Sequence, residues 1–149
     1  MQRFPRRVVL TGLVGATALG IAAYSVADTG VRDTLTPEQA HRAAQAGKIL
    51  IVDIRRPDEW VRTGIAEGAV PIDMRRDDFV DAVLAERMSN AQPIALICAR
   101  GVRSARMTNR LTQAGLTQII DIPEGMLGSF AGPGWVKRDL PIRVWSENG

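Results

Sequence analysis

Two short apolar runs constrain the fold of this chain more than any other feature. Residues 49–53 read ILIVD and residues 93–98 read PIALIC, and each run has the length of one strand. Neither run alternates apolar with polar side chains, and both contain β-branched residues. A strand of this kind is buried on both faces, which is typical of a parallel sheet covered by helices. The two runs therefore predict an α/β domain.

Helical patterns lie between these runs, as parallel strands require. Thr36 and Gln39 have the spacing of a capping box, and Pro37 suits the first position of a helix. We expect helices over residues 36–46, 77–88 and 104–114, shorter helices within 55–63 and 125–130, and further strands at 69–72 and 118–122. This alternation predicts a mainly parallel sheet flanked by helices.

The net charge of the chain comes from its N-terminus. The 149 residues include 19 Lys and Arg against 16 Asp and Glu. Residues 1–27 contain three arginines and no acid, so 19 minus 3 leaves 16 basic against 16 acidic side chains in residues 28–149. This balance argues against nucleic acid as a partner. One Cys and one His exclude an internal disulfide and the usual zinc sites. We expect neither a metal nor an organic cofactor.

Residues 1–27 have the layout of a signal peptide. A basic start is followed by an uncharged, mostly small and apolar stretch, and Ser25-Val26-Ala27 places small residues at a cleavage site. The Arg6-Arg7 pair leaves the twin-arginine and general secretory routes open. Residues 8–27 are also just long enough for an uncleaved membrane anchor. Both alternatives place the remaining chain, which begins with a linker at 28–33, in the periplasm.

The single cysteine, Cys98, ends one of the two apolar runs. A tight loop follows it, and the helix expected from residue 104 begins directly after the loop. Backbone amides of such a loop and the positive end of the helix dipole form an anion cradle, which favours a thiolate. The loop consists of Ala99, Arg100, Gly101, Val102, Arg103 and Ser104. The plain alternative is an inert, buried cysteine with solvated arginines nearby.

The segment CARGVRS at residues 98–104 resembles the C-x-x-G-x-R-S active-site loop of rhodanese-like domains. Residues 50–60 and 64–72 are similar to two further landmarks of that family, and its closing landmarks have counterparts up to residue 142. Two departures from the family pattern occur: Ala66 and Glu67 alter the spacing of the 64–72 segment, which lacks the family's usual His, and the stretch between residues 128 and 137 is extended. We expect this stretch to form a loop at the rim of the pocket. The resemblance assigns the domain to residues 34–145 and a C-terminal tail to 146–149.

The resemblance implies a five-stranded, mainly parallel sheet flanked by helices and the transfer of sulfane sulfur through a persulfide on Cys98. It implies that the loop amides cradle the persulfide and that Arg100 and Arg103 contact anionic donors such as thiosulfate. It also assigns a supporting role to Asp53 and Arg55, which we interpret as ordering the loop. Two alternatives remain open: Asp53 as a strand cap and Arg55 as a surface residue.

Related phosphatases of this fold carry a longer C-x5-R loop, whereas the arginine here follows Cys98 after four residues. The tighter ring suits a sulfur atom better than a phosphate tetrahedron. The leading hypothesis is an exported sulfurtransferase that takes sulfur from thiosulfate or a persulfide and passes it to a thiol or cyanide. The alternative is a persulfide carrier or sulfur-sensing module that acts only with a protein partner, such as a periplasmic redox or sulfur-carrier protein.

Overall fold

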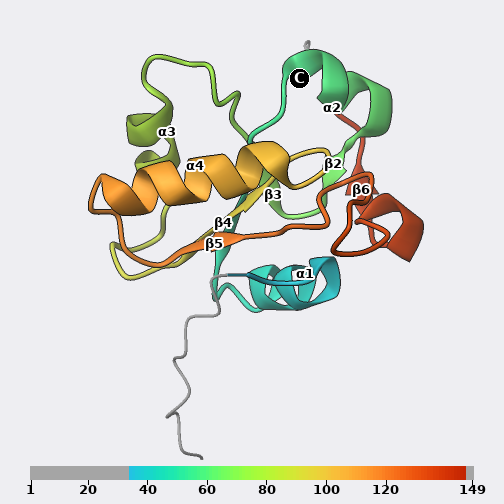
Figure 1. The fold of residues 1–149 in the computed structure, drawn as a ribbon, viewed down its shortest axis with the longest axis horizontal. Coiled ribbons are helices and arrows are strands. Elements are labelled where there is room, and N and C mark those ends of the chain that lie inside the picture. The colour runs from blue at the N-terminus through green and yellow to red at the C-terminus, as the bar shows by residue number, and fades with distance from the viewer. Residues whose placement is uncertain (1–33, 147–149) are drawn as a thin grey trace, which may run out of the picture.

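The computed structural model describes residues 34–146, and the predicted signal segment lies outside them. Four parallel strands form the central sheet in the order β3-β1-β4-β5 (Figure 1). The strands are β1 (Leu50–Asp53), β3 (Ala69–Pro71), β4 (Ile94–Ile97) and β5 (Ile119–Asp121). The two apolar runs are thus neighbouring central strands, and the predicted α/β fold is confirmed.

The sheet has four parallel strands within the described residues rather than the expected five. Beyond β5, Thr34 makes only a single parallel bridge with Asp121, and the Leu35 amide donates to the Asp121 carbonyl at 2.9 Å. The chain leaves the sheet at this point because Thr36 caps the next helix, whose first residue is Pro37. A proline cannot donate the next hydrogen bond of the ladder.

A second, two-stranded antiparallel sheet joins β2 (Ile65–Ala66) to β6 (Ile142–Arg143). This pairing brings the end of the domain back beside the segment that follows α2 (Pro57–Thr63). Trp145, just after β6, packs edge-on against Trp60 of α2 with ring centroids 5.1 Å apart. The C-terminal segment therefore closes over the same end of the molecule as α2.

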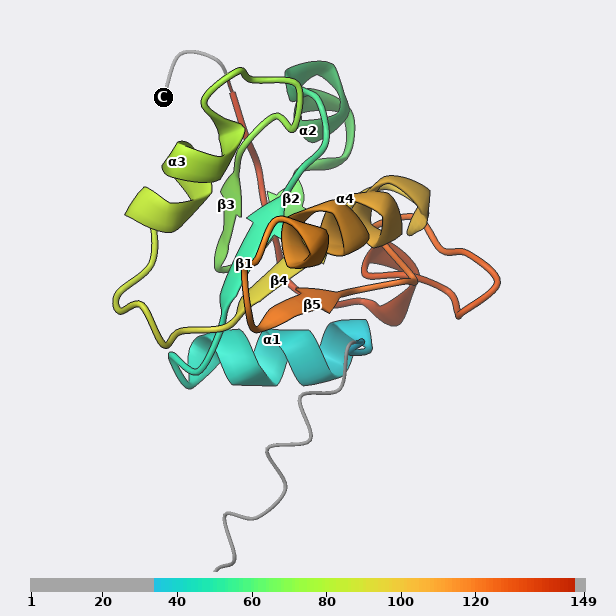
Figure 2. The same ribbon diagram turned by 60° about the vertical axis from the view of Figure 1, so that its left-hand side comes forward.

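Helices cover both faces of the central sheet. Figures 1 and 2 show α1 (Pro37–Gln45) on one face and α3 (Phe79–Ala85) and α4 (Val102–Gln113) on the other. The strands supply apolar side chains to both layers: Val52 faces the core beneath α3 and α4, whereas its neighbour Ile51 faces the core beside α1. This two-sided burial is the physical reason that the strands lack alternation.

The expected helix over residues 125–130 is wrong, because this segment forms a turn. Its amides hydrogen-bond outward rather than within a helix. The Met126 amide donates to the Cys98 carbonyl and the Leu127 amide to the Ala99 carbonyl, both at 2.8 Å. The turn at residues 123–127 is consequently tied to the end of β4 and to the loop that follows it.

Candidate active site

Cys98 follows β4 and lies at the base of the loop that leads into α4, with only 1% of its surface exposed. Its sulfur accepts hydrogen bonds from the backbone amides of Gly101 at 3.1 Å and Ser104 at 3.4 Å. Amides fixed in this way stabilise negative charge on sulfur more than a neutral thiol. Both amides that donate to the Cys98 sulfur therefore belong to the predicted loop.

The Ser104 side chain completes the surroundings of the sulfur. Its hydroxyl oxygen lies 3.5 Å from Cys98 Sγ, and the hydroxyl is also 3.2 Å from the Gly101 carbonyl oxygen, to which it donates. With its proton directed to that carbonyl, the Ser104 oxygen can accept the proton of a Cys98 thiol. When the sulfur is ionised, the same hydroxyl can turn and donate to it.

Two glycines allow the loop to sit against the turn at residues 123–127. Gly101 has a φ of +80°, and a Cβ at this position would lie 2.1 Å from the Pro123 carbonyl oxygen. Gly125 has a φ of +66°, and its Cβ would lie 2.6 Å from the Ala99 carbonyl oxygen. Both positions thus require glycine for backbone conformation and for space. The sequence analysis placed Gly101 in the loop and assigned no role to Gly125.

Asp53 and Arg55 form a buried ion pair at 2.7 Å, and neither side chain is exposed. The guanidinium also donates to the carbonyl of Gly64 and the hydroxyl of Thr63, each at 2.7 Å. Arg55 is therefore not a surface residue, and Asp53 does more than cap a strand. The pair holds the end of α2 against β1 and makes no hydrogen bond to the Cys98 loop, so any ordering of that loop is indirect.

The indirect connection runs through Glu59 on α2. Its two carboxylate oxygens accept hydrogen bonds from the Arg103 guanidinium at 2.6 and 2.7 Å. Hydrogen bonding from Arg103 lowers the pKa of Glu59 to about 2. Sequence reasoning assigned no role to Glu59, which lies 44 residues from Arg103 in the chain.

Arg103 therefore differs from the expectation that it contacts a donor anion. Its guanidinium is occupied by a carboxylate and is part of the scaffold that joins the Cys98 loop to α2. Arg100 is different: it is exposed and has no hydrogen-bonding or ion-pair partner among residues 34–146. Of the two predicted anion contacts, Arg100 alone presents a free cation in this part of the chain.

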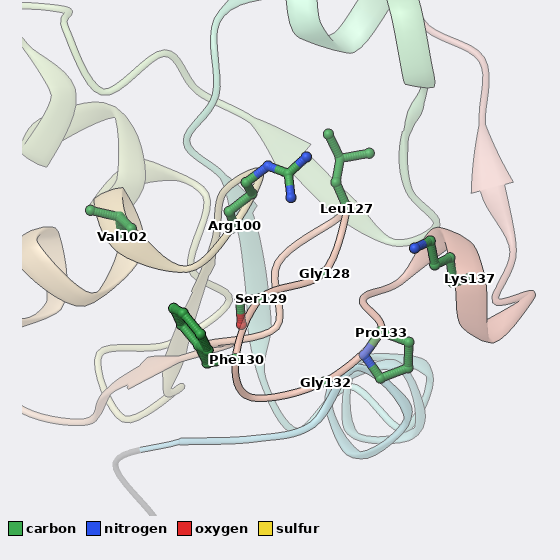
Figure 3. Close-up of a pocket in the computed structure, with 9 residues that line it drawn as sticks. All are labelled: Arg100, Val102, Leu127, Gly128, Ser129, Phe130, Gly132, Pro133 and Lys137. Atoms are coloured by element: carbon green, nitrogen blue, oxygen red, sulfur yellow. The ribbon is translucent and has the colours of Figure 1, made fainter.

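A cavity of about 600 Å³ lies beside the loop and is shown in Figure 3. Arg100 and Val102 line it from the loop and from α4, and Gly132 and Pro133 contribute to the opposite wall. Segment 128–137 thus contributes much of the lining of this cavity, whereas Cys98 is not among its lining residues. The remaining lining residues are Leu127, Gly128, Ser129, Phe130 and Lys137.

No metal-binding cluster of three or more His, Cys, Asp or Glu side chains occurs between residues 34 and 146. Within the same described region, no helix is both long and apolar enough to cross a membrane.

The model of the family "Rhodanese-like domain" matches residues 36–129. The chain is 24% identical over 106 residues to the tRNA uridine(34) hydroxylase of Chlamydia abortus, an alignment that covers 67% of this chain and 32% of that protein. The chain thus spans about a third of the length of the curated relatives that it matches.

Solved structures have the same fold. The polysulfide-sulfur transferase homodimer of Wolinella succinogenes aligns with a TM-score of 0.57 and 22% identity, covering 76% of this chain and 80% of that chain. The thiosulfate sulfurtransferase of Pseudomonas aeruginosa aligns with a TM-score of 0.59 and 21% identity, covering 74% of this chain and 20% of that chain. At these identities the likeness concerns the fold.

Proposed function

Because this chain belongs to the rhodanese-like domain family, we propose that it is an exported sulfurtransferase that carries sulfane sulfur as a persulfide on Cys98. The observation that carries the proposal is the position of the Cys98 sulfur. It accepts hydrogen bonds from the backbone amides of Gly101 at 3.1 Å and Ser104 at 3.4 Å. The names of two structural neighbours, a polysulfide-sulfur transferase and a thiosulfate sulfurtransferase, agree with this chemistry.

The proposed reaction is a double displacement. The Cys98 thiolate attacks the outer sulfur of thiosulfate, a new S–S bond forms, and sulfite leaves with the electron pair of the broken S–S bond. A thiolate or cyanide acceptor then attacks the outer sulfur of the Cys98 persulfide, and the Cys98 thiolate is the leaving group. The two amides stabilise the negative sulfur at the start and at the end of this cycle.

The donor anion is attracted chiefly by Arg100 and the loop amides. Arg103 adds little net charge because Glu59 neutralises it at 2.6 Å. Its contribution is to hold the first turn of α4 in place, which keeps the Ser104 amide directed at Cys98. The two arginines therefore have different roles, whereas the sequence suggested the same role for both.

The test is a thiosulfate and cyanide assay on wild-type protein and on Cys98→Ser, which is nearly isosteric. Wild type forms thiocyanate and the serine variant does not, although its circular dichroism and thermal unfolding match those of the wild type. Thiocyanate formation by Cys98→Ser at the wild-type rate would overturn the proposal.

Export is part of the proposal and rests on residues 1–27, which lie outside the described residues. Cleavage after Ala27 gives a mature protein that begins at Asp28 and resides in the periplasm. N-terminal sequencing of protein recovered from the periplasmic fraction tests this step. Recovery of the uncleaved chain in membranes indicates the anchored alternative, and cytoplasmic recovery contradicts export.

Two other functions are alternatives to the proposed sulfurtransferase activity. A carrier or sensing module would form the same persulfide and release it only to a protein partner, so it would fail the cyanide assay but still gain sulfur. The hydroxylase names of the curated relatives suggest tRNA modification, at 24% identity over 106 residues. The balanced charge of residues 28–149 favours small sulfur compounds over nucleic acid as substrates.

A further inference from the structure

We propose that Asp121 of β5 is a positioning residue for sulfur transfer, which holds the proton of the Cys98 thiol through the hydroxyl of Ser104. This inference rests on the proposed persulfide chemistry of Cys98 and adds the group that takes the thiol proton. Its components are a nearly inaccessible nucleophile, a buried carboxyl with an unpartnered oxygen, and a hydroxyl that acts on both.

The proton of the Cys98 thiol needs an acceptor within the protein. Cys98 is only 1% exposed, so bulk water has little access to its proton. The single histidine, His41, lies on α1 and packs edge-on against Trp135, in the core on the opposite face of the sheet from Cys98. The acceptor must therefore come from the side of the sheet that α3 and α4 cover.

Asp121 lies on that side, at the end of β5. Ile119 packs in the core beneath α3 and α4 and Ile120 in the core beside α1, so the alternation of the strand turns Asp121 towards α4 again. Its partner on the neighbouring strand β4 is Leu96, two residues before Cys98. Figure 2 shows α4 lying over both strands. The fold thus places an acid beneath the helix that follows the Cys98 loop.

The Asp121 carboxyl is buried in a way that favours its neutral form. The residue is 6% exposed, and its Oδ1 atom accepts no hydrogen bond from any group in residues 34–146. Burial raises the pKa of this carboxyl, and hydrogen bonding from the Ser104 side chain opposes the rise only in part. A carboxyl in such surroundings holds a proton more readily than an exposed one.

Asp121 also differs from the other buried acids of the described region, which are Asp53, Glu59 and Glu124. Each of those three is paired with an arginine, whereas Asp121 makes no ion pair within residues 34–146. Around the sulfur, the paired cations are Arg55 and Arg103, and the exposed ones are Arg100 on the loop and Arg106 and Arg110 on α4. Asp121 is therefore the buried acid of this region that no cation keeps ionised.

Ser104 connects the acid to the sulfur. Its hydroxyl oxygen lies 3.5 Å from Cys98 Sγ, and the same side chain is the one whose hydrogen bonding affects the pKa of Asp121. In the conformation described, the hydroxyl donates to the Gly101 carbonyl at 3.2 Å, and Asp121 Oδ1 is without a partner. A hydroxyl donates one proton and accepts others, so rotation of this proton from Gly101 to Asp121 links the three side chains.

The linked side chains have two states with the same net charge. In the first, the Cys98 thiol donates to the Ser104 oxygen, and the Ser104 hydroxyl donates to the ionised Asp121. In the second, the S–H bond has broken and its proton is on the Ser104 oxygen, while the former hydroxyl proton is on Asp121. No electrons are transferred and no proton leaves the site. The amides of Gly101 and Ser104 favour the second state because they stabilise negative sulfur.

The experiment follows the proton on Asp121 by carbon-13 NMR of the aspartate carboxyl groups in the full-length protein during a pH titration. The Asp121 signal is the one missing from the isosteric variant Asp121→Asn. We expect its acid dissociation constant to be smaller by about 10-fold or more in wild type than in Cys98→Ser, whose hydroxyl does not ionise. The ultraviolet absorbance of the Cys98 thiolate should appear at pH values at which Asp121 is still protonated.

Ser104→Ala tests the connection between the two groups. In this background, Cys98→Ser should change the dissociation constant of Asp121 by about 2-fold or less, because the hydroxyl that couples the groups is absent. The matched control is Thr108→Val, which removes another buried hydroxyl of α4 and should retain the wild-type difference.

Equal dissociation constants of Asp121 in wild type and Cys98→Ser would overturn the inference, as would a thiolate that forms only after Asp121 has ionised. A difference that persists in Ser104→Ala would also contradict it. The titration uses no sulfur donor. Its failure therefore leaves the persulfide chemistry of Cys98 standing, which the thiosulfate and cyanide assay tests separately.

Discussion

The two arginines of the Cys98 loop show how one residue type serves two purposes. Arg100 is exposed and free among the described residues, whereas Arg103 shares its guanidinium with Glu59 at 2.6 and 2.7 Å. Sequence alone treats them as equivalent because it does not show that a carboxylate 44 residues away reaches only one of them. Their substitutions should therefore have different effects.

Arg100→Ala should raise the KM for thiosulfate by about 10-fold or more, which corresponds to a charge-assisted contact of ~1.5–3 kcal/mol. Turnover with an uncharged organic persulfide should change little. Arg103→Ala should instead lower the free energy of unfolding, because Glu59 is left buried without its main partner. Steady-state kinetics with both donors and urea unfolding test these expectations. Equal losses with charged and uncharged donors for Arg100→Ala would contradict them.

Glu59 also makes the free energy of unfolding depend on pH in the acidic range. Its pKa falls from 4.5 to about 2 in the folded protein, chiefly through hydrogen bonding to Arg103. The ionised carboxylate therefore stabilises the fold fully above about pH 4.5, and this contribution is lost as the pH falls from 4.5 towards 2. Glu59→Gln should be less stable than wild type at pH 7 and should lose less stability on acidification through this interval. If the free energy of unfolding of the two proteins changed equally with pH over this interval, Glu59 would not contribute to the acid dependence of stability.

At the scale of elements, the turn at residues 123–127 and the loop after β4 behave as one unit. The unit depends on Gly125, whose absent side chain leaves room for the Ala99 carbonyl oxygen. Gly115 provides a matched comparison, because its φ of +90° is equally unusual but nothing lies within 4 Å of its Cβ position. Substitutions at the two glycines therefore distinguish the cost of a left-handed backbone, which both share, from the cost of a steric clash, which only Gly125 has.

Gly115→Ala should cost about 1–2 kcal/mol from the left-handed backbone alone. Gly125→Ala should cost clearly more and should also reduce sulfur transfer, because the added Cβ displaces the loop that holds Cys98. Urea unfolding and the thiosulfate assay on both variants measure the difference. Equal destabilisation with full activity in Gly125→Ala would mean that the turn does not position the loop.

The buried pair of Asp53 and Arg55 joins β1 to α2, and removal of one partner leaves an uncompensated buried charge. Asp53→Asn should reduce the free energy of unfolding by about 3–5 kcal/mol. Asp58, which pairs with Arg62 at 2.9 Å on the surface, is the control, and Asp58→Asn should cost less than ~1 kcal/mol. Similar losses for the two variants would contradict a structural role for the buried pair.

The elements predicted well from the sequence are those whose signals are local. The apolar runs of β1 and β4 and the capping box of α1 depend on neighbouring residues, and all three are confirmed. The turn at 123–127 was missed because its hydrogen-bond partners are the carbonyls of Cys98 and Ala99, which are distant in sequence. The expected fifth strand is absent from the described residues, where only a single parallel bridge joins Thr34 to Asp121 beside β5.

At the scale of the whole molecule, the fold places one nucleophile at a point where loop, helix and turn converge. The position of Cys98 and the loop amides at its sulfur followed from the sequence, whereas the contacts of this loop with Glu59 and with the turn at residues 123–127 did not. Such a site is built by tertiary contacts between segments that carry no shared sequence signal. Sulfur transfer by this protein therefore depends on the chemistry of Cys98.

Intact-mass spectrometry of the purified protein after incubation with thiosulfate tests this chemistry most directly. We predict a gain of about 32 Da, one sulfur atom, that maps to the peptide containing Cys98 and disappears when cyanide is added. Cys98→Ser protein treated in the same way should keep its original mass. An unchanged mass for wild type, or a sulfur adduct that persists in Cys98→Ser, would contradict the persulfide mechanism.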